Sequence, residues 1–224
     1  MNAGQRVRAE FLAAGTTYAN RDGDFSAWHR GRTHFAVWAI AVDDPRLTAR
    51  LAEARLRFGT LLRGDYARQP HITLQVCGFP CRQAAATDDY GLDRLAGQAR
   101  RLAASGVGPF DIALGACNSF AAAPFFEVAD RSASLARLRD ALEAEHAEER
   151  SVPYVPHLTL GLYAAETPVA TVLPCIDACV AAPIALRVER IELMAYESSV
   201  IGGPLTTLCS FDLAQRRIVW PRLS

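Results

Sequence analysis

The chain has 224 residues, of which 50% are hydrophobic and 21% are charged, so it can bury a core and is not disordered. Its 24 basic residues balance its 24 acidic residues, which argues against a protein that coats long nucleic acids by neutralising phosphates. All 24 basic residues are arginine. The absence of lysine excludes a phosphate-loop lysine, a Schiff base and a lysyl-adenylate, and leaves arginine, histidine, amides and hydroxyls to bind anions.

No stretch approaches the roughly 20 apolar residues of a membrane span, and residues 1–32 lack the apolar segment of a signal peptide. We therefore expect a cytoplasmic protein with no membrane partner, in which the six cysteines are reduced. The pairs Cys77/Cys81 and Cys175/Cys179 have three residues between their members, which is not the usual spacing of a zinc knuckle. Free thiols are favoured over a metal site, and no metal or other cofactor is expected.

In chain order, residues 1–33 read as an arm with a short helix over 6–14, and residues 34–224 as one domain. Apolar runs and alternation predict strands at 34–42, 69–78, 109–115, 125–129, 156–163, 184–196 and 205–213. Caps, stop signals and helical periodicity predict helices at 45–59, 88–104, 132–149 and 167–180. This alternation of strands and helices indicates an α/β or α+β fold.

Two of the predicted strands open with nearly the same residues. Pro-His-Ile-Thr-Leu at 70–74 and Pro-His-Leu-Thr-Leu at 156–160 agree at four of five positions, and their histidines are 86 residues apart. The numbers of His and Thr in the chain predict about 0.3 His-x-Thr pairs by chance. Either histidine alone is more typical of a buried structural residue, but the repeat with identical neighbours favours a shared function.

Alternation along a strand puts His71 and Thr73 on one face, and His157 and Thr159 on one face of the second strand. If the two segments belong to duplicated halves, a pseudo-twofold axis brings both pairs to one groove. Two imidazoles and two hydroxyls suit metal-free phosphodiester chemistry. One neutral imidazole takes a proton, an imidazolium supplies one, and the hydroxyls donate hydrogen bonds to phosphate oxygens.

At this point the sequence resembles the 2H phosphoesterase superfamily, and within it the bacterial 2′-5′ RNA ligase and RNA 2′,3′-cyclic phosphodiesterase proteins. The resemblance covers about residues 34–214. It implies an α+β, bilobal, duplicated fold with two mainly antiparallel sheets flanking a central groove and helices outside. It also implies His71 and His157 as the acid–base pair, and Thr73 and Thr159 as phosphate-binding residues.

The sequence departs from the family pattern after the second motif, where many members carry an arginine and this chain continues Gly-Leu-Tyr. Arg32 and Arg68 are the candidates to replace it. Alternation places Tyr163 beside the second motif and Gln75 beside the first, and Tyr196 ends a late strand where it could shape the groove.

The resemblance implies a phosphodiesterase that hydrolyses the 2′,3′-cyclic phosphate of an RNA 3′ end or a nucleotide to a 2′-phosphate, with 2′-5′ ligation as the reverse reaction. Two alternatives stay open: a phosphodiesterase for a small cyclic or 2′-5′-linked nucleotide, and an inactive module that binds nucleotides or RNA ends. A monomer is expected in each case.

Overall fold

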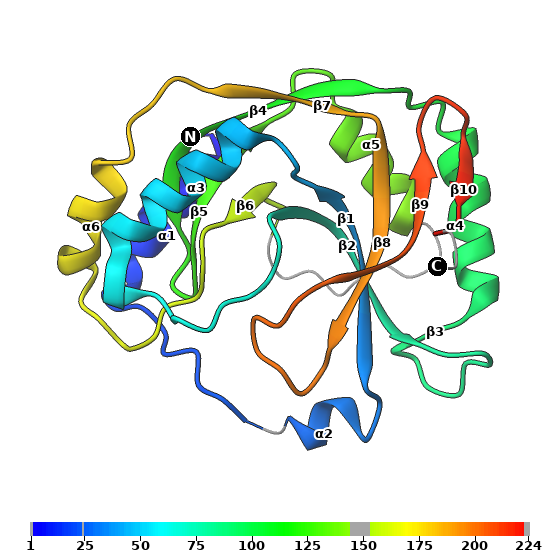
Figure 1. The fold of residues 1–224 in the computed structure, drawn as a ribbon, viewed down its shortest axis with the longest axis horizontal. Coiled ribbons are helices and arrows are strands. Elements are labelled where there is room, and N and C mark those ends of the chain that lie inside the picture. Colours follow the sequence, from blue (N-terminus) through cyan, green and yellow to red (C-terminus); the bar gives the residue numbers. More distant parts are fainter. Residues whose placement is uncertain (1, 24, 144–152, 222–224) are drawn as a thin grey trace.

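The computed structural model describes residues 2–23, 25–143 and 153–221. Its strands form two curled sheets (Figure 1), the larger in the order β10-β9-β8-β1-β2-β3 and the smaller in the order β6-β5-β4-β7. All pairings are antiparallel except that of β2 with β3. The α+β class with two mainly antiparallel sheets and flanking helices is therefore confirmed.

The larger sheet consists of β1 (His34–Ala41), β2 (His71–Pro80), β3 (Asp89–Tyr90), β8 (Arg190–Glu197), β9 (Thr206–Asp212) and β10 (Arg217–Val219). The smaller sheet consists of β4 (Phe110–Ser119), β5 (Pro124–Ala129), β6 (His157–Thr159) and β7 (Ile184–Val188). The helices are α1 (Ala3–Ala14), α2 (Ser26–His29), α3 (Pro45–Phe58), α4 (Leu92–Ala104), α5 (Ser134–Glu143) and α6 (Val169–Asp177), with a 3-10 turn at Gly59–Leu61.

Local signals account for α3, which matches the predicted helix. The Asp44 carboxylate accepts hydrogen bonds from the amides of Arg46 and Leu47, and Pro45 occupies the first turn. The buried stripe of α3 then packs on the core, and Gly59 ends the helix with a φ of 50°, where a residue without a Cβ is favoured.

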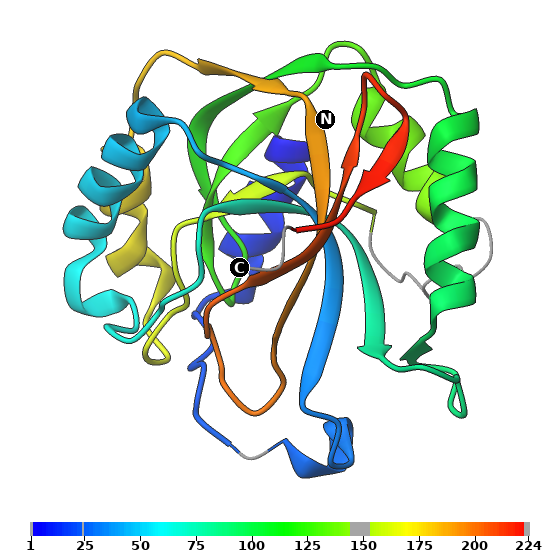
Figure 2. The same cartoon turned by 45° about the vertical axis from the view of Figure 1, so that its right-hand side comes forward.

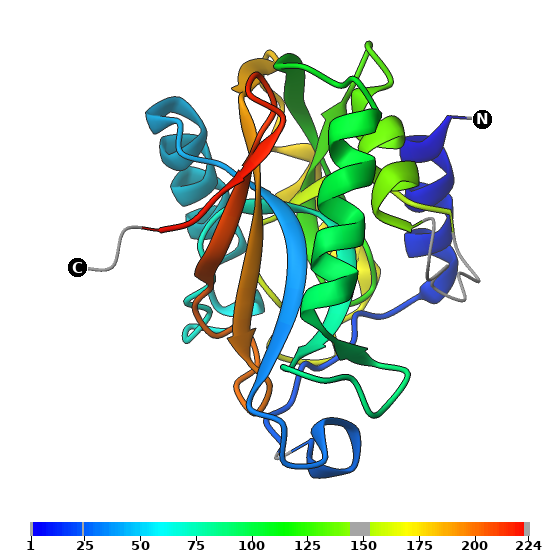
Figure 3. The ribbon, with the colours of Figure 1, turned by 90° about the vertical axis from the view of Figure 1, so that its right-hand side faces the viewer.

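Two pairs of helices cover the sheets. Helices α4 and α5 pack on each other beside the larger sheet, whereas α3 and α6 pack on each other and α6 contacts β4 of the smaller sheet (Figure 3). Trp38 of β1 is fully buried on the helix side, where its indole nitrogen donates to Gln98 Oε1 of α4 at 2.9 Å. The core therefore runs continuously from one sheet to the other.

The N-terminal arm is fastened along the smaller sheet. Helix α1 packs on β4 and buries Val7 and Phe11. Beyond it, the Asn20 side-chain amide donates to the carbonyls of Ala122 and Tyr163 at 2.9 and 3.0 Å. The arm then crosses to α2, which lies at the far end of β1 (Figure 2), where Trp28 packs against the rings of neighbouring aromatic residues.

Several element bounds differ from the prediction. Helix α4 begins at Leu92 rather than at residue 88 because Asp89 and Tyr90 pair with the end of β2. Strand β6 ends at Thr159, although the Leu160 amide still donates to the Pro124 carbonyl. The predicted helix over 132–149 is present as α5, and its residues 144–149 lie outside the described part. No helix among the described residues has the length and apolarity needed to cross a bilayer.

Candidate active site

The two motif strands come from different sheets and lie against each other. Strand β2 of the larger sheet contacts β6 of the smaller one, and both occupy the middle of the molecule in Figures 1 and 2. On β2, Ile72 and Leu74 are fully buried in the core, so His71 and Thr73 face the other way. On β6, buried Leu158 alternates in the same manner with His157 and Thr159.

The two imidazoles are held by matching local contacts. His71 Nδ1 lies 2.8 Å from the Gln69 carbonyl oxygen, and His157 Nδ1 lies 2.7 Å from the Val155 carbonyl oxygen. In each motif the acceptor is thus the carbonyl two residues earlier. Since a carbonyl only accepts, the proton sits on Nδ1 and the neutral ring keeps an acceptor lone pair on Nε2. Within the described residues neither Nε2 has a hydrogen-bond partner.

Burial sets the protonation of both rings. It lowers the pKa of His71 from 6.5 to about 4, against the opposing effect of the hydrogen bond to Gln69. The positive charge of Arg68, and that of His157 when it is protonated, lower the pKa further. Burial also lowers the pKa of His157, and its hydrogen bond to Val155 opposes this. Both histidines are therefore neutral at pH 7 in the free protein.

A side-chain clamp joins the first motif to the segment before the second. The Tyr154 hydroxyl donates to the Thr73 carbonyl at 2.8 Å. The Arg139 guanidinium lies 3.6 Å over the Tyr154 ring and donates to the Leu74 carbonyl. Glu143, one turn along α5, forms an ion pair with Arg139 at 2.6 Å. These contacts fix β2 relative to the chain that enters β6. The sequence offered no sign of the contacts to β2, because Tyr154 and Arg139 are distant from Thr73 and Leu74 along the chain.

Aromatic rings surround His157. Its ring lies 5.0 Å from that of Phe120 in an edge-to-face arrangement and 5.2 Å from that of Phe125, and these two phenylalanines stack at 4.4 Å. Phe125 faces Thr159 across the β5–β6 pairing. The second motif therefore has an apolar wall, which accounts for the burial of the imidazole.

Tyr196 lies on the face of the larger sheet that carries His71. Tyr196 pairs with Phe35 of β1. By alternation, Phe35 is on the same face of β1 as Ala39 and Ala41, which pair with Thr73 and His71 of β2. The ring of Tyr196 is half-buried, and the guanidinium of Arg68 lies 4.1 Å above it.

Of the two arginines considered as replacements for the missing one, Arg68 is near the first motif and Arg32 is already engaged. The positive charge of Arg68 acts on His71, while its Nε donates to the Gly203 carbonyl at 3.2 Å. Arg32 forms ion pairs with Asp88 and Asp89 at 2.7 and 2.8 Å and lies over the Phe79 ring. Arg68 is thus the better candidate for an anion contact.

A β-bulge in β2 corrects the placement of Gln75. Thr73 pairs with Ala39 and Gln75 with Trp38, so Leu74 is an extra residue and the alternation is interrupted. Gln75 consequently follows Trp38 to the helix side, where it is 1% exposed. The position on the His71 face belongs to Val76, which pairs with Val37.

Tyr163 is likewise placed inside the core. Its side chain is fully buried, and its hydroxyl lies 2.7 Å from Ser119 Oγ. Strand alternation cannot be extended to this residue because β6 ends at Thr159. The residues gathered around the two histidines are therefore Thr73, Thr159 and the clamp and aromatic residues, with Arg68 and Tyr196 beside the first motif.

The side chains that the two motifs present are imidazoles and hydroxyls. Among the described residues, no three His, Cys, Asp or Glu side chains gather in a way that could hold a metal ion. The chemistry available to these residues is proton transfer and hydrogen bonding to an anion.

The fold and this site define a class: a two-sheet α+β protein in which one strand of each sheet presents a His-x-Thr motif to its counterpart. The sequence profile of the 2′-5′ RNA ligase superfamily matches residues 43–199. The protein belongs to this superfamily, so the resemblance noted from the motifs is confirmed.

Solved structures show the same fold at low sequence identity. E. coli LigT in its apo form aligns with a TM-score of 0.56 and 16% identity over 83% of this chain and 100% of LigT. The protein TT0787 of Thermus thermophilus aligns with a TM-score of 0.54 and 19% identity over 80% of this chain and 97% of that chain. E. coli LigT complexed with 3′-AMP aligns with a TM-score of 0.54 and 17% identity, over 82% of this chain and 99% of LigT. No curated protein matches the sequence.

Proposed function

We propose that the protein is a metal-independent phosphodiesterase that opens 2′,3′-cyclic phosphates, on RNA 3′ ends or on nucleotides, to 2′-phosphates. The observation that carries the proposal is the matched pair of imidazoles, each with Nδ1 engaged by its own strand and Nε2 left for a substrate. Membership of the superfamily supports phosphoester chemistry, and the LigT structures with 3′-AMP and ATP support a nucleotide ligand.

The reaction needs one base and one acid. A neutral imidazole accepts a proton through Nε2 from the attacking water, whose oxygen forms a bond to phosphorus. The bond from phosphorus to O3′ breaks, and the other histidine, as imidazolium, donates its Nε2 proton to that oxygen. Thr73 and Thr159 donate hydrogen bonds to the non-bridging oxygens, where negative charge is held in the transition state.

The surroundings favour His71 as the base. Its pKa is lowered to about 4, and the cation of Arg68 acts on it in addition to burial. Burial lowers the pKa of His157 too, and its hydrogen bond to Val155 opposes this effect. The negative charge of a bound cyclic phosphate stabilises an imidazolium, and His157 is the easier ring to protonate. Arg68 then contacts the phosphate or the nucleotide beside Tyr196.

Turnover of 2′,3′-cyclic AMP and of a short RNA ending in a cyclic phosphate, with EDTA present, tests this function. His71→Ala and His157→Ala should each lower the rate by a factor of about 10²–10⁴. His34→Ala, at an exposed position on β1, is the matched control and should keep full activity. A strict requirement for metal, or full activity in either motif variant, would refute the mechanism.

The same assay separates the remaining candidates. Turnover of the nucleotide alone favours a small cyclic or 2′-5′-linked substrate over an RNA end. Binding without turnover, with affinity kept in the His71→Ala variant, favours an inactive binding module. Joining of RNA ends through a 2′-5′ linkage would reveal the reverse reaction, which uses the same acid and base.

A further inference from the structure

Three cysteines that the proposed function does not use come together where α6 meets the smaller sheet. Cys117 lies on β4, Cys175 lies in the last turn of α6, and Cys179 follows two residues after the end of this helix. All three are partly exposed and pack against the edge of the core, whereas Cys77 and Cys209 are buried. Cys117 also lines a surface cavity of about 480 Å³ together with Arg8 and Asp177, so small solutes can reach it.

The contacts distinguish the three thiols. The side chains of Cys117 and Cys179 are hydrogen-bonded to each other. Cys175 is turned toward α3, with its sulfur 3.4 Å from the Arg57 carbonyl oxygen. The sulfur of Cys179 also lies 3.2 Å from the Cys175 carbonyl oxygen, which can accept a hydrogen bond from the protonated thiol. Cys117 and Cys179 therefore form the pair that faces each other.

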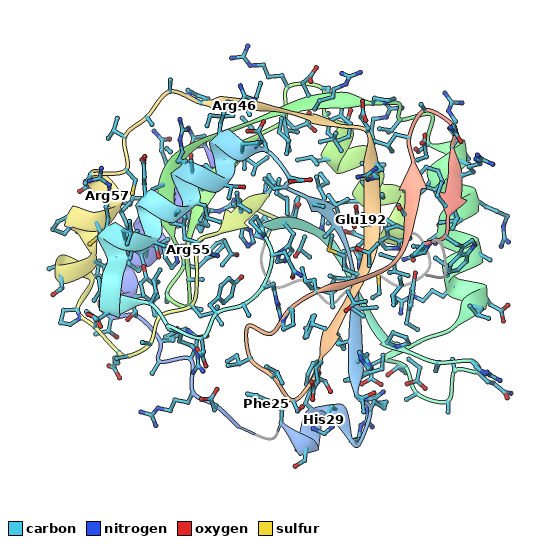
Figure 4. The ribbon with its side chains drawn as sticks, viewed as in Figure 1. Phe25, His29, Arg46, Arg55, Arg57 and Glu192 are labelled. Atoms are coloured by element: carbon cyan, nitrogen blue, oxygen red, sulfur yellow. The ribbon has the colours of Figure 1, made fainter. Side chains whose placement is uncertain are left out.

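The pair is chemically unequal. The hydrogen bond from Cys117 lowers the pKa of Cys179 to about 7, and the cation of Arg57, which lies beside α6 in Figure 4, lowers it as well. The same hydrogen bond and burial raise the pKa of Cys117. One member of the pair is thus available as a thiolate at neutral pH while its neighbour stays a thiol, as in redox-sensing pairs.

We propose that Cys179 and Cys117 form a peroxide-oxidisable pair that closes to a disulfide joining the segment just after α6 to β4. The Cys179 thiolate attacks one oxygen of hydrogen peroxide, the O–O bond breaks, and hydroxide leaves and takes up a proton. The resulting sulfenic acid is attacked by the Cys117 sulfur, which forms the S–S bond, loses its proton and releases water. In total, two thiols and one peroxide give one disulfide and two waters.

This inference is independent of the phosphodiesterase proposal, since its readouts are thiol chemistry. Treatment of the reduced full-length protein with hydrogen peroxide, followed by alkylation and tryptic mass spectrometry, should link the peptide 102–131, which contains Cys117, to the peptide 151–187. Because the second peptide contains Cys175 and Cys179, the experiment is repeated on Cys175→Ser, where the link should persist.

Two substitutions at Cys117 separate its roles. Cys117→Ser keeps a hydroxyl donor next to Cys179, so the Cys179 thiol should still be alkylated with a midpoint near pH 7. Peroxide should then leave a sulfenic acid on Cys179, which dimedone traps. Cys117→Ala removes the donor and should move the alkylation midpoint upward. Cys81→Ser, at the end of β2, is the control and should leave the disulfide yield unchanged.

Failure to find the 102–131 to 151–187 link in folded, peroxide-treated protein would overturn the proposal. Faster alkylation of Cys81 than of Cys179 at pH 7 would also overturn it, because Cys81 has its pKa raised by burial and by the nearby Asp89. Loss of the link in Cys175→Ser, together with its persistence in Cys179→Ser, would show that Cys175 rather than Cys179 bonds to Cys117, and would refute the proposal.

Discussion

Acid should destabilise the folded protein through His71. The pKa of this buried imidazole is about 4 in the folded state against 6.5 ordinarily. Below pH 6.5 the unfolded chain binds a proton at this residue that the folded protein does not bind until about pH 4. The stabilising contribution of neutral His71 is therefore complete above pH 6.5, decreases as the pH falls, and is fully lost below about pH 4.

The magnitude follows from the shift. This difference in the pKa of His71 between the folded and unfolded states corresponds to a loss of at most about 3 kcal/mol in the free energy of unfolding. At pH 5 the unfolded state is already largely protonated and the folded state is not, so about 2 kcal/mol of the free energy of unfolding is lost. Burial lowers the pKa of His157 as well, so that residue adds a loss of the same sign.

Urea unfolding at pH 7 and pH 5 measures the loss, and His71→Asn isolates the part that belongs to this residue. The asparagine amide can still donate to the Gln69 carbonyl but does not titrate. The wild-type protein should lose about 2 kcal/mol more than the variant between the two pH values, because all other groups cancel in the comparison. Equal losses in the two proteins would refute a neutral, buried His71.

Three further substitutions test the contacts around the site. Tyr154→Phe leaves the Thr73 carbonyl without its donor, so we expect a loss of roughly 1–2 kcal/mol in thermal unfolding and a lower kcat for a cyclic nucleotide; unchanged kinetics would argue against the clamp. Asn20→Ala removes the amide that fastens the arm to the Tyr163 carbonyl, and limited proteolysis should then cut the arm faster, whereas an unchanged cutting rate would show that α1 alone holds it. Leu138→Ala on α5 opens a cavity at a fully buried position and should cost about 2–5 kcal/mol in urea unfolding; a cost below about 1 kcal/mol would contradict the tight packing of α5.

The features that the sequence predicts well are those set by neighbouring residues. The repeat at 70–74 and 156–160 predicts two strands with polar residues on one face, and β2 and β6 have this arrangement. The Asp44-Pro45 start and the apolar stripe predict α3 for the same reason, since caps and periodicity act within a few residues. The fold class follows from the order of such elements together with the family resemblance.

The positions that sequence reasoning misplaces depend on pairing between distant segments. Strict alternation puts Gln75 beside Thr73, but the extra residue Leu74 in the β1–β2 register turns Gln75 toward Trp38. Nothing in the local sequence marks this bulge, because it is defined only relative to the partner strand. The position of Tyr163 is mispredicted for a related reason, because the strand that would fix the direction of its side chain ends at Thr159.

The difference between the two histidines has the same origin. The repeated Pro-His-x-Thr-Leu segment gives both imidazoles the same local setting, with Nδ1 on the carbonyl two residues earlier, and so makes both suitable for the same proton transfer. The hydrolysis that we propose needs them in opposite protonation states. That asymmetry comes from residues outside the repeat: Arg68 acts on His71, while two phenylalanine rings enclose His157. In the proposed mechanism, a duplicated motif thus supplies two equivalent groups, and the unrelated segments packed beside each copy give them different roles.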